Sequence, residues 1–307
     1  MSIMPEFRGT LLVMQGDEVL ADVVAAGHTP GTRFQIASVS KQFTAAAVLL
    51  LAQRGLLRLD DRIGRWIDGC PASWDGITLH HLLAHTSGLG HWNEYPMIDL
   101  FRPLPPPELL AAFGQVPPLS APGDRWHYSS PGYVLLAHVV ARAADRPYRD
   151  VLAREFFEPL GMADTFVGSP GDRSALAQGH GPDGEPVPSY ELDVVAMGAG
   201  DVWSTTGDLI RWLDGLRAGR LLDARHLGLM LAEHAATGHE PDSRGYGYGC
   251  FVGSFNGEQW FHHSGGNSGF RSFAACLPAS DRRIVVLSDS EAMDGAVLNE
   301  LLAAAFG

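Results

Sequence analysis

Residues 34–53 read Phe-Gln-Ile-Ala-Ser-Val-Ser-Lys-Gln-Phe-Thr-Ala-Ala-Ala-Val-Leu-Leu-Leu-Ala-Gln, and their second part predicts a buried helix. From Ser38 to Gln53 there is no Pro or Gly, and Ala and Leu recur throughout. Gly55 follows as a typical C-terminal stop signal. Because apolar side chains surround this helix, we expect other elements to cover it on every side.

Short apolar runs at both ends of the chain predict strands. Near the N-terminus, Gly9–Gln15 and Glu18–Ala26 flank Gly16-Asp17, which is a good hairpin turn. Near the C-terminus four further runs are separated by turn residues: Tyr246–Phe255, Gln259–His263, Phe270–Leu277 and Arg282–Ser288. A final run, Ala292–Phe306, is typical of a terminal helix.

The region between these strands is mostly helical, with pieces broken by Pro-rich loops such as Pro103–Pro107. Within it, Thr205–Asp208 matches a capping box that opens the amphipathic run Leu209–Leu216. Strands at both ends of a chain most simply share one antiparallel sheet. We therefore predict an α+β fold in one domain, residues 1–307. Its α/β lobe would span about 1–60 and 240–307, and its all-helical lobe about 61–239.

Composition excludes some classes of function. The chain has 22 basic and 35 acidic residues, a formal charge of −13, which argues against binding to nucleic acid. The first eight residues lack a secretory leader, and the longest apolar run is too short to span a bilayer, so a cytoplasmic location without membrane contact is expected. Cys70, Cys250 and Cys276 fit no metal spacing and indicate buried thiols.

Ser38-Val39-Ser40-Lys41 places a hydroxyl and an amine on one face of the predicted helix, one turn apart. A serine hydroxyl is a weak nucleophile that needs a neighbouring base. A lysine buried between helix and sheet has a lowered pKa and can accept the proton. The helix N-terminus favours the negative charge that forms during attack on a carbonyl. The spacing predicts a nucleophile and its base, although the tetrapeptide alone also occurs by chance in many chains.

Lys41 is the only lysine in the chain, and the other 21 basic residues are arginine. Arginine cannot lose its proton in a protein, whereas a desolvated lysine can. A site that needs a neutral amine would explain this exception, and chance would explain it equally simply.

Two later segments add groups of the right chemistry. Tyr128-Ser129-Ser130 precedes a helical run, and a phenol beside a lysine can pass a proton to a leaving group. His263-Ser264-Gly265-Gly266 follows a predicted strand, where glycines allow close approach and a backbone N–H can stabilise an oxyanion. Taken singly, the first segment is better explained as a surface loop and the second as a plain turn between two strands.

The order Ser-x-x-Lys, Tyr-x-x before a helix and His-x-Gly after a strand resembles the serine β-lactamase and penicillin-binding-protein superfamily. Further segments are similar to that family: Phe34–Thr44, Leu56–Arg62, Ile77–Leu89, Gly200–Leu209 and His263–Ser272. The resemblance spans about Gly9 to Ser288. It points to the class C-like branch, which includes carboxylesterases, D-aminopeptidases and acyltransferases, and it implies a sheet flanked by helices beside a helical lobe.

The resemblance implies a role for each matching residue. Ser38 would be acylated, Lys41 would be the base or its partner, and Tyr128 would relay protons near the leaving group. The N–H groups of Ser38 and Gly266 would form the oxyanion hole. Ser130, His263 and Gly265 would contact substrate.

Two departures limit what the resemblance implies. Ser130 stands where the family usually has Asn, so recognition of an amide substrate is in doubt. His263 stands where antibiotic-hydrolysing members have Lys, which replaces a permanent cation by a titratable ring. This form resembles the esterase and D-aminopeptidase branches and argues against efficient β-lactam hydrolysis.

Other signals carry less weight. Trp92, Trp126 and Trp203 fall near the motif segments and are candidates for apolar walls of the cleft, although a Trp is more often part of the core. His81 and His85 have i, i+4 spacing, but no acidic residue of a His-Glu-x-x-His motif lies between them. We therefore expect neither a metal nor another cofactor.

We expect a serine hydrolase that acts on a small ester or amide, either a carboxylesterase or a D-amino-acid-type peptidase. An acyltransferase that uses the same site is the alternative. A binding or sensor module that is acylated but never released is a further one.

Overall fold

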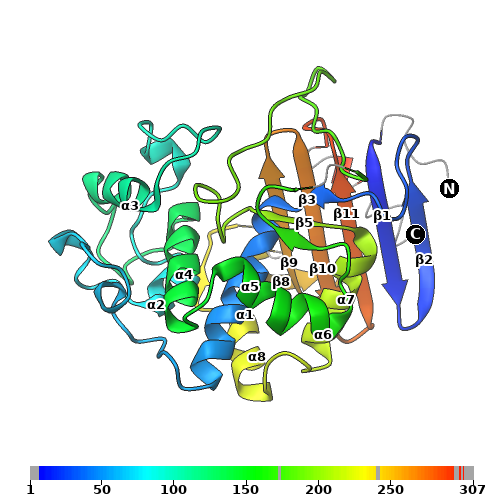
Figure 1. The fold of residues 1–307 in the computed structure, drawn as a ribbon. Coiled ribbons are helices and arrows are strands. Elements are labelled where there is room, and N and C mark those ends of the chain that lie inside the picture. The colour runs from blue at the N-terminus through cyan, green and yellow to red at the C-terminus, as the bar shows by residue number, and fades with distance from the viewer. Residues whose placement is uncertain (1–6, 172–173, 240–242, 294–296, 299, 301–307) are drawn as a thin grey trace.

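The computed structural model describes residues 7–171, 174–239, 243–293, 297, 298 and 300. Within them, eight antiparallel strands form one sheet in the order β2-β1-β11-β10-β9-β8-β7-β6 (Figure 1). The first strands, β1 (Gly9–Gln15) and β2 (Glu18–Val24), lie beside the last, β11 (Arg282–Ser288). The prediction that both ends of the chain share one sheet is therefore confirmed.

The remaining strands of this sheet are β6 (Ala235–Ala236), β7 (Gly245–Tyr246), β8 (Phe251–Phe255), β9 (Glu258–Asn267) and β10 (Phe270–Leu277). The single strand predicted over Tyr246–Phe255 is wrong, because a turn separates β7 from β8. Gly249 lies in that turn with a φ of 74°, a left-handed conformation that suits glycine, and it abuts the backbone of Lys41.

Strand β9 is longer than predicted. The sequence suggests an end at His263, but pairing with β10 continues to Asn267, opposite Phe270. The turn lies at Ser268-Gly269 instead, where Gly269 has a φ of 77°. Gly265 and Gly266 are therefore strand residues, and the prediction that they follow the strand is wrong.

The middle of the sheet is buried on both faces, as β11 illustrates. Ile284 and Val286 join one apolar cluster, whereas Val285 and Leu287 join another, because successive side chains point to opposite faces. Helix α7 (Thr206–Arg217) packs on β1 and β11.

The helix predicted from Ser38 consists of two parts, a 3₁₀ turn, η1 (Ala37–Val39), and helix α1 (Ser40–Gln53). Nearly all of α1 is buried, and it packs against α4, α5 and α8. Gly55 follows the helix with a φ of 71°, which confirms the predicted stop signal.

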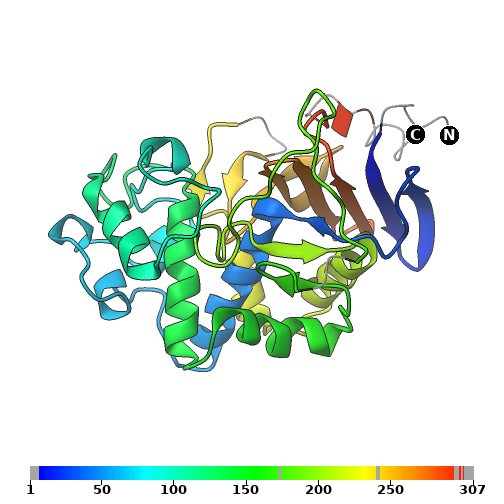
Figure 2. The ribbon, with the colours of Figure 1, turned by 45° about the horizontal axis from the view of Figure 1, so that its top comes forward.

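The remaining helices and short strands lie between residues 79 and 231 in the sequence: α2 (Leu79–Leu83), α3 (Pro106–Gln115), α4 (Ser130–Ala143), α5 (Tyr148–Leu152), α6 (Glu158–Leu160), α8 (Ala224–Leu231), β4 (Phe166–Val167) and β5 (Val202–Ser204). Helices α2, α3 and α4 gather at the side of the molecule away from β1 and β2 (Figures 1 and 2). Strand β5 pairs with β3 (Phe34–Gln35) and with β4 in a second, three-stranded sheet.

The segment 61–239, which the sequence assigns to an all-helical lobe, is not helical throughout. It contains β4, β5 and β6, and its helix α7 covers the main sheet. Half of the predicted capping box is present, since Thr205 accepts a hydrogen bond from the Asp208 N–H at 3.2 Å. The Asp208 carboxylate turns instead to Thr165 and Arg211.

The predicted terminal helix Ala292–Phe306 lies largely outside the described residues. Among the helices that are described, none has both the length and the apolar character required to cross a membrane.

Candidate active site

Ser38 lies in η1, the tight turn between strand β3 and helix α1. The residue before it, Ala37, has a φ of 46°, a left-handed conformation that is uncommon for a residue with a Cβ. The turn is held from both sides. The Ile36 N–H donates to Val202 O at 2.9 Å, and Ser272 Oγ donates to Ile36 O at 2.6 Å. Ser38 itself is half-buried and faces a cavity.

Lys41 lies one helical turn beyond Ser38 and is fully buried. Its Nζ has three oxygen neighbours: Ser38 Oγ at 3.1 Å, Ser130 Oγ at 3.1 Å and Ala199 O at 2.7 Å. Burial lowers the pKa of Lys41 to about 7, against a smaller opposing effect of the Asp201 carboxylate. A large share of Lys41 is therefore a neutral amine near pH 7, which can accept a proton from the Ser38 hydroxyl.

Tyr128 faces the same two groups from the loop before α4. Its ring centroid is 5.0 Å from Lys41 Nζ, and its side chain shares a hydrogen bond with Ser38. Burial raises the pKa of Tyr128, and the hydrogen bond with Ser38 opposes that rise only in part. The phenol therefore keeps its proton near neutral pH and can relay one.

Two histidines hold the loop that carries Tyr128. The Ser129 N–H donates to His85 Nδ1 at 3.1 Å, and the Ser130 N–H donates to His91 Nδ1 at 3.2 Å. Burial lowers the pKa of His91 to about 4 and that of His85 well below its usual value, so both rings are neutral acceptors. From sequence, His85 is considered above for a metal, and no motif indicates His91.

Strand β9 packs directly on the Ser38 turn through Gly265. A Cβ at Gly265 would lie 2.5 Å from Ile36 O and 2.9 Å from Ser38 N, so only glycine fits this position. Gly266, next along the strand, lines the cavity on which Ser38 opens. Asn267 lines the cavity as well. Its side chain is held in place, because Nδ2 donates to Gln35 Oε1 at 2.7 Å and to Gly200 O at 2.9 Å.

The cavity beside Ser38 has a volume of about 320 Å³. Of the predicted residues, Ser38, Trp92, Ser130 and Gly266 line it. Trp92, Leu100 and Val195 add apolar surface, and no Asp, Glu, Lys or Arg is among its lining residues.

Four residues predicted to contact substrate or to form the cleft walls do not line this cavity: Gly265, Trp126, His263 and Trp203. His263 is 1% exposed, and its Nε2 lies 3.1 Å from Tyr246 Oη. Burial, with a smaller effect of nearby Lys41, lowers the pKa of His263 to about 3, so the ring offers no cation for a substrate carboxylate. Trp203 lies in β5 and lines a neighbouring cavity that shares only Tyr190 with the first.

Asp201 is a group of the site region to which the sequence alone gives no role, although it lies within the family-like segment Gly200–Leu209. It is 0% exposed, and burial raises its pKa to about 7. Its place beside Lys41 arises because β5, which follows it, pairs with β3, which precedes Ser38. Because 160 residues separate Lys41 from Asp201 in the sequence, no local pattern predicts that they lie close together.

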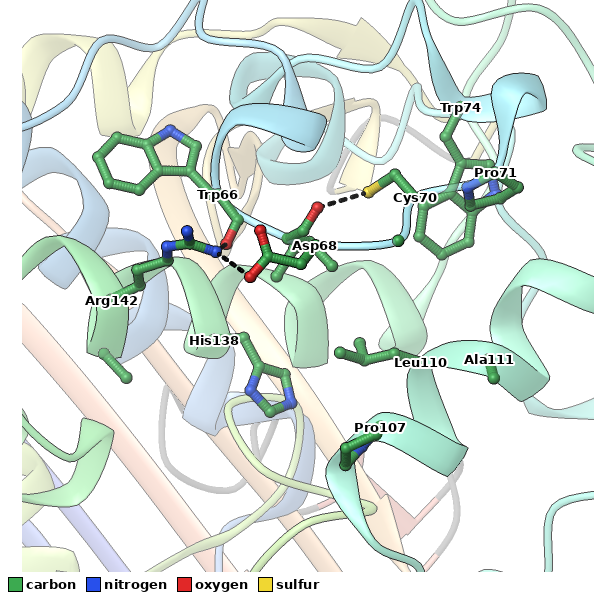
Figure 3. A pocket seen from close by; sticks show the side chains of 13 residues that line it. Trp66, Asp68, Cys70, Pro71, Trp74, Pro107, Leu110, Ala111, His138 and Arg142 are labelled. Atoms are coloured by element: carbon green, nitrogen blue, oxygen red, sulfur yellow. Dashed lines mark hydrogen bonds and ion pairs between the residues drawn. The ribbon is translucent and has the colours of Figure 1, made fainter.

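A larger cavity of about 560 Å³ lies against α3 and α4, and it contains Cys70, His138 and Asp68 (Figure 3). These residue types can form a thiol nucleophile with its base. Figure 3 shows the Cys70 thiol well apart from the His138 ring, and the thiol donates to Ile67 O at 3.3 Å. Burial, followed by the charge of Asp68, raises the pKa of Cys70. This cavity therefore contains no activated nucleophile.

The histidines considered for a metal have other partners. The Thr78 N–H donates to His81 Nδ1 at 3.2 Å as part of the cap of α2, and His80 Nδ1 lies 2.7 Å from Tyr248 Oη. Over the described part of the chain, no group of three or more His, Cys, Asp or Glu residues is arranged to hold a metal ion.

Known proteins are similar to this chain in sequence and in fold. Residues 6–306 match the family model described as Beta-lactamase. Esterase EstB from Burkholderia gladioli is 32% identical over 263 residues, which cover 71% of this chain and 66% of the esterase. Penicillin-binding protein 4* from Bacillus subtilis (strain 168) is 32% identical over 182 residues, which cover 53% of this chain and 38% of that protein. The chain thus spans less than two thirds of the length of either relative.

Among solved structures, the D-amino acid amidase from Ochrobactrum anthropi SV3 has a TM-score of 0.83 and 25% identity, and the match covers 97% of this chain and 96% of the amidase. The family model and this structural match both cover nearly the whole chain. The chain belongs to the Beta-lactamase family.

Proposed function

We propose that this protein is a serine hydrolase that cleaves a small ester or amide through an acyl-enzyme on Ser38. The observation that carries the proposal is the contact of 3.1 Å between Ser38 Oγ and the Nζ of a fully buried Lys41. The names of the relatives, an esterase and a D-amino acid amidase, agree with this class of substrate. We also propose that both lobes of the chain work as one catalytic unit.

In the first step, neutral Lys41 takes the proton of Ser38 Oγ while Oγ forms a bond to the substrate carbonyl carbon. The carbonyl electron pair moves to its oxygen, and the N–H groups of Ser38 and Gly266 would stabilise that negative charge. When the tetrahedral intermediate collapses, the bond from carbon to the leaving oxygen or nitrogen breaks. Tyr128 gives its proton to the leaving group and regains one from the Lys41 ammonium.

In the second step, water attacks the acyl-enzyme. It loses a proton to the same Lys41 and Tyr128 pair, the bond to Ser38 Oγ breaks, and Oγ is reprotonated. An alcohol or amine in place of water would make the product of an acyltransferase, because the same groups handle its proton.

Ser130 takes the place of the usual Asn and provides a hydroxyl at 3.1 Å from Lys41 Nζ. This keeps the lysine in position but removes an amide side chain that could bind a substrate amide. With uncharged walls and a neutral His263, the cavity favours an acyl group without a charge. An ester with a short apolar acyl chain is therefore the substrate that we propose first.

The test is a time course with p-nitrophenyl butyrate, in which nitrophenol release and intact protein mass are followed together. Native protein should release nitrophenol over many turnovers and gain the mass of an acyl group, whereas Ser38→Ala should do neither. Full activity in Ser38→Ala would exclude the proposal. One equivalent of product with a lasting adduct would indicate an acylated sensor, and faster release with added methanol, together with methyl butyrate, would indicate an acyltransferase.

A further inference from the structure

Asp201 is a buried carboxylate that the proposed chemistry leaves unused. It is fully buried, and neither carboxylate oxygen has a hydrogen-bond partner of ordinary geometry among the described residues. Backbone N–H groups of Gly198 and of Asp201 itself lie close enough to favour its ionised form to some degree. A carboxylate that is buried without full hydrogen bonding is costly unless an opposite charge compensates it.

The backbone on both sides of Asp201 is tied to the first turn of α1. Lys41 Nζ donates to Ala199 O at 2.7 Å, two residues before Asp201. The Val202 N–H, directly after it, donates to Ser40 Oγ at 3.1 Å. Asp201 O accepts from the Gly168 N–H at 2.8 Å. Asp201 is therefore fixed beside the part of α1 that carries Lys41.

Lys41 is the cation that acts on this carboxylate, without a direct ion pair between the two described side chains. Each group acts electrostatically on the other, and Lys41 is the only lysine of the whole chain. The other titratable groups near the pair come from several elements: Tyr128 and Tyr133 beside Lys41, His85, His91 and His263 within its electrostatic reach, and Tyr148 and Asp193 beside Asp201. Burial raises the pKa values of all three tyrosines, so they keep their protons near neutral pH and Asp201 is the carboxylate that acts on Lys41.

We infer that Asp201 is a positioning residue that makes Lys41 a stronger base by stabilising its ammonium form. Attack by Ser38 turns the neutral amine into an ammonium ion, and the ionised form of the Asp201 carboxylate lowers the free energy of that change. The catalytic part of this inference rests on the proposed function. The predicted effect on the pKa of Lys41 does not depend on the proposed function.

Asp201→Asn tests the inference because it removes the charge and keeps the shape. Without the carboxylate, the pKa of Lys41 should fall further, by roughly one pH unit, the lower end of the usual effect of a nearby opposite charge. Since the chain has one lysine, protein labelled with ¹³Cε-lysine gives one lysine signal, whose pH titration reports Lys41 directly.

The matched control is Asp193→Asn, which removes a nearby carboxylate that acts on Asp201 but not on Lys41. The Lys41 midpoint should stay close to that of the native protein in this variant. Circular dichroism and a thermal melt establish that each variant is folded. If Asp201→Asn does not fold, Asp201→Ala removes the same charge and should shift the midpoint in the same direction. An unchanged or raised midpoint in a folded Asp201 variant would overturn the inference.

The pH profile of ester hydrolysis then tests the catalytic consequence. In Asp201→Asn, the acidic limb of kcat/KM should move to lower pH together with the Lys41 midpoint, and the plateau should fall about tenfold because the base is weaker. If Ser38→Ala keeps full activity, the proposed function fails while the lysine titration still decides the role of Asp201. If Ser38→Ala is inactive and Asp201→Asn changes neither the midpoint nor the profile, the inference alone fails.

Discussion

Gly265→Ala tests whether the close packing of strand β9 on the Ser38 turn is required for activity. The added methyl group would lie 2.5 Å from Ile36 O and 2.9 Å from Ser38 N, with Ser272 Oγ closer still. Ordinary contacts begin near 3.4 Å, so β9 and the Ser38 turn would have to move apart by roughly 1 Å. That gap lies between the two N–H groups proposed to bind the oxyanion.

The size of the effect follows from this displacement. Overpacking a tight interior contact costs about 1–3 kcal/mol of the free energy of unfolding. This would lower Tm by a few degrees in a chain of this length. A misplacement of about 1 Å at a reacting centre can reduce the rate about 100-fold. We therefore expect a folded protein whose kcat/KM for p-nitrophenyl butyrate falls about 100-fold.

Two other glycines provide controls. At Gly266, a Cβ would meet Arg271 Nη1 at 3.4 Å, so Gly266→Ala should leave Tm nearly unchanged. At Gly228 in α8, no heavy atom lies within 4 Å, so Gly228→Ala should keep full activity and slightly raise Tm. If Gly265→Ala has native Tm and native activity, the argument from close packing on Ser38 is wrong.

Three further outcomes follow from the geometry. Lys41→Arg should abolish turnover, with a loss of about 1000-fold or more in kcat/KM, because a guanidinium cannot accept the Ser38 proton; activity within tenfold of native would contradict the role of the amine. In native protein, kcat/KM should rise with pH through about 7 as Lys41 loses its proton, and a profile that is flat from pH 5 to 9 would contradict this. Tyr128→Phe should reduce kcat about 100-fold for an alkyl ester and much less for a nitrophenyl ester, whose leaving group needs no proton; equal losses on both substrates would argue against the proton relay.

Features set by local sequence could be predicted. The sheet shared by both chain ends, the buried helix and its stop at Gly55 follow from apolar runs and turn residues. The contact between Ser38 and Lys41 follows from their spacing on adjacent turns. The place of Ser130 beside Lys41 required the resemblance to a family, because 89 residues separate them.

Features set by tertiary packing could not be predicted from local sequence. Gly265 and Gly266 look like a turn in sequence but lie within a strand, and the Ser38 turn against which Gly265 packs makes glycine necessary there. The direction of the His263 ring depends on Tyr246, which forms its hydrogen bond from another strand. Asp201 comes beside Lys41 only because β5 pairs with β3, and no local pattern encodes that pairing.

The proposed chemistry is tested most directly by locating the acyl group. Native protein and Ser38→Ala would be mixed with p-nitrophenyl butyrate, quenched in acid within the first turnover, digested and mapped by mass spectrometry. We predict a butyryl group on Ser38 in the native protein and none in the variant. A butyryl group on another residue in native protein, or turnover in Ser38→Ala without any adduct, would contradict the assignment of Ser38 as the nucleophile.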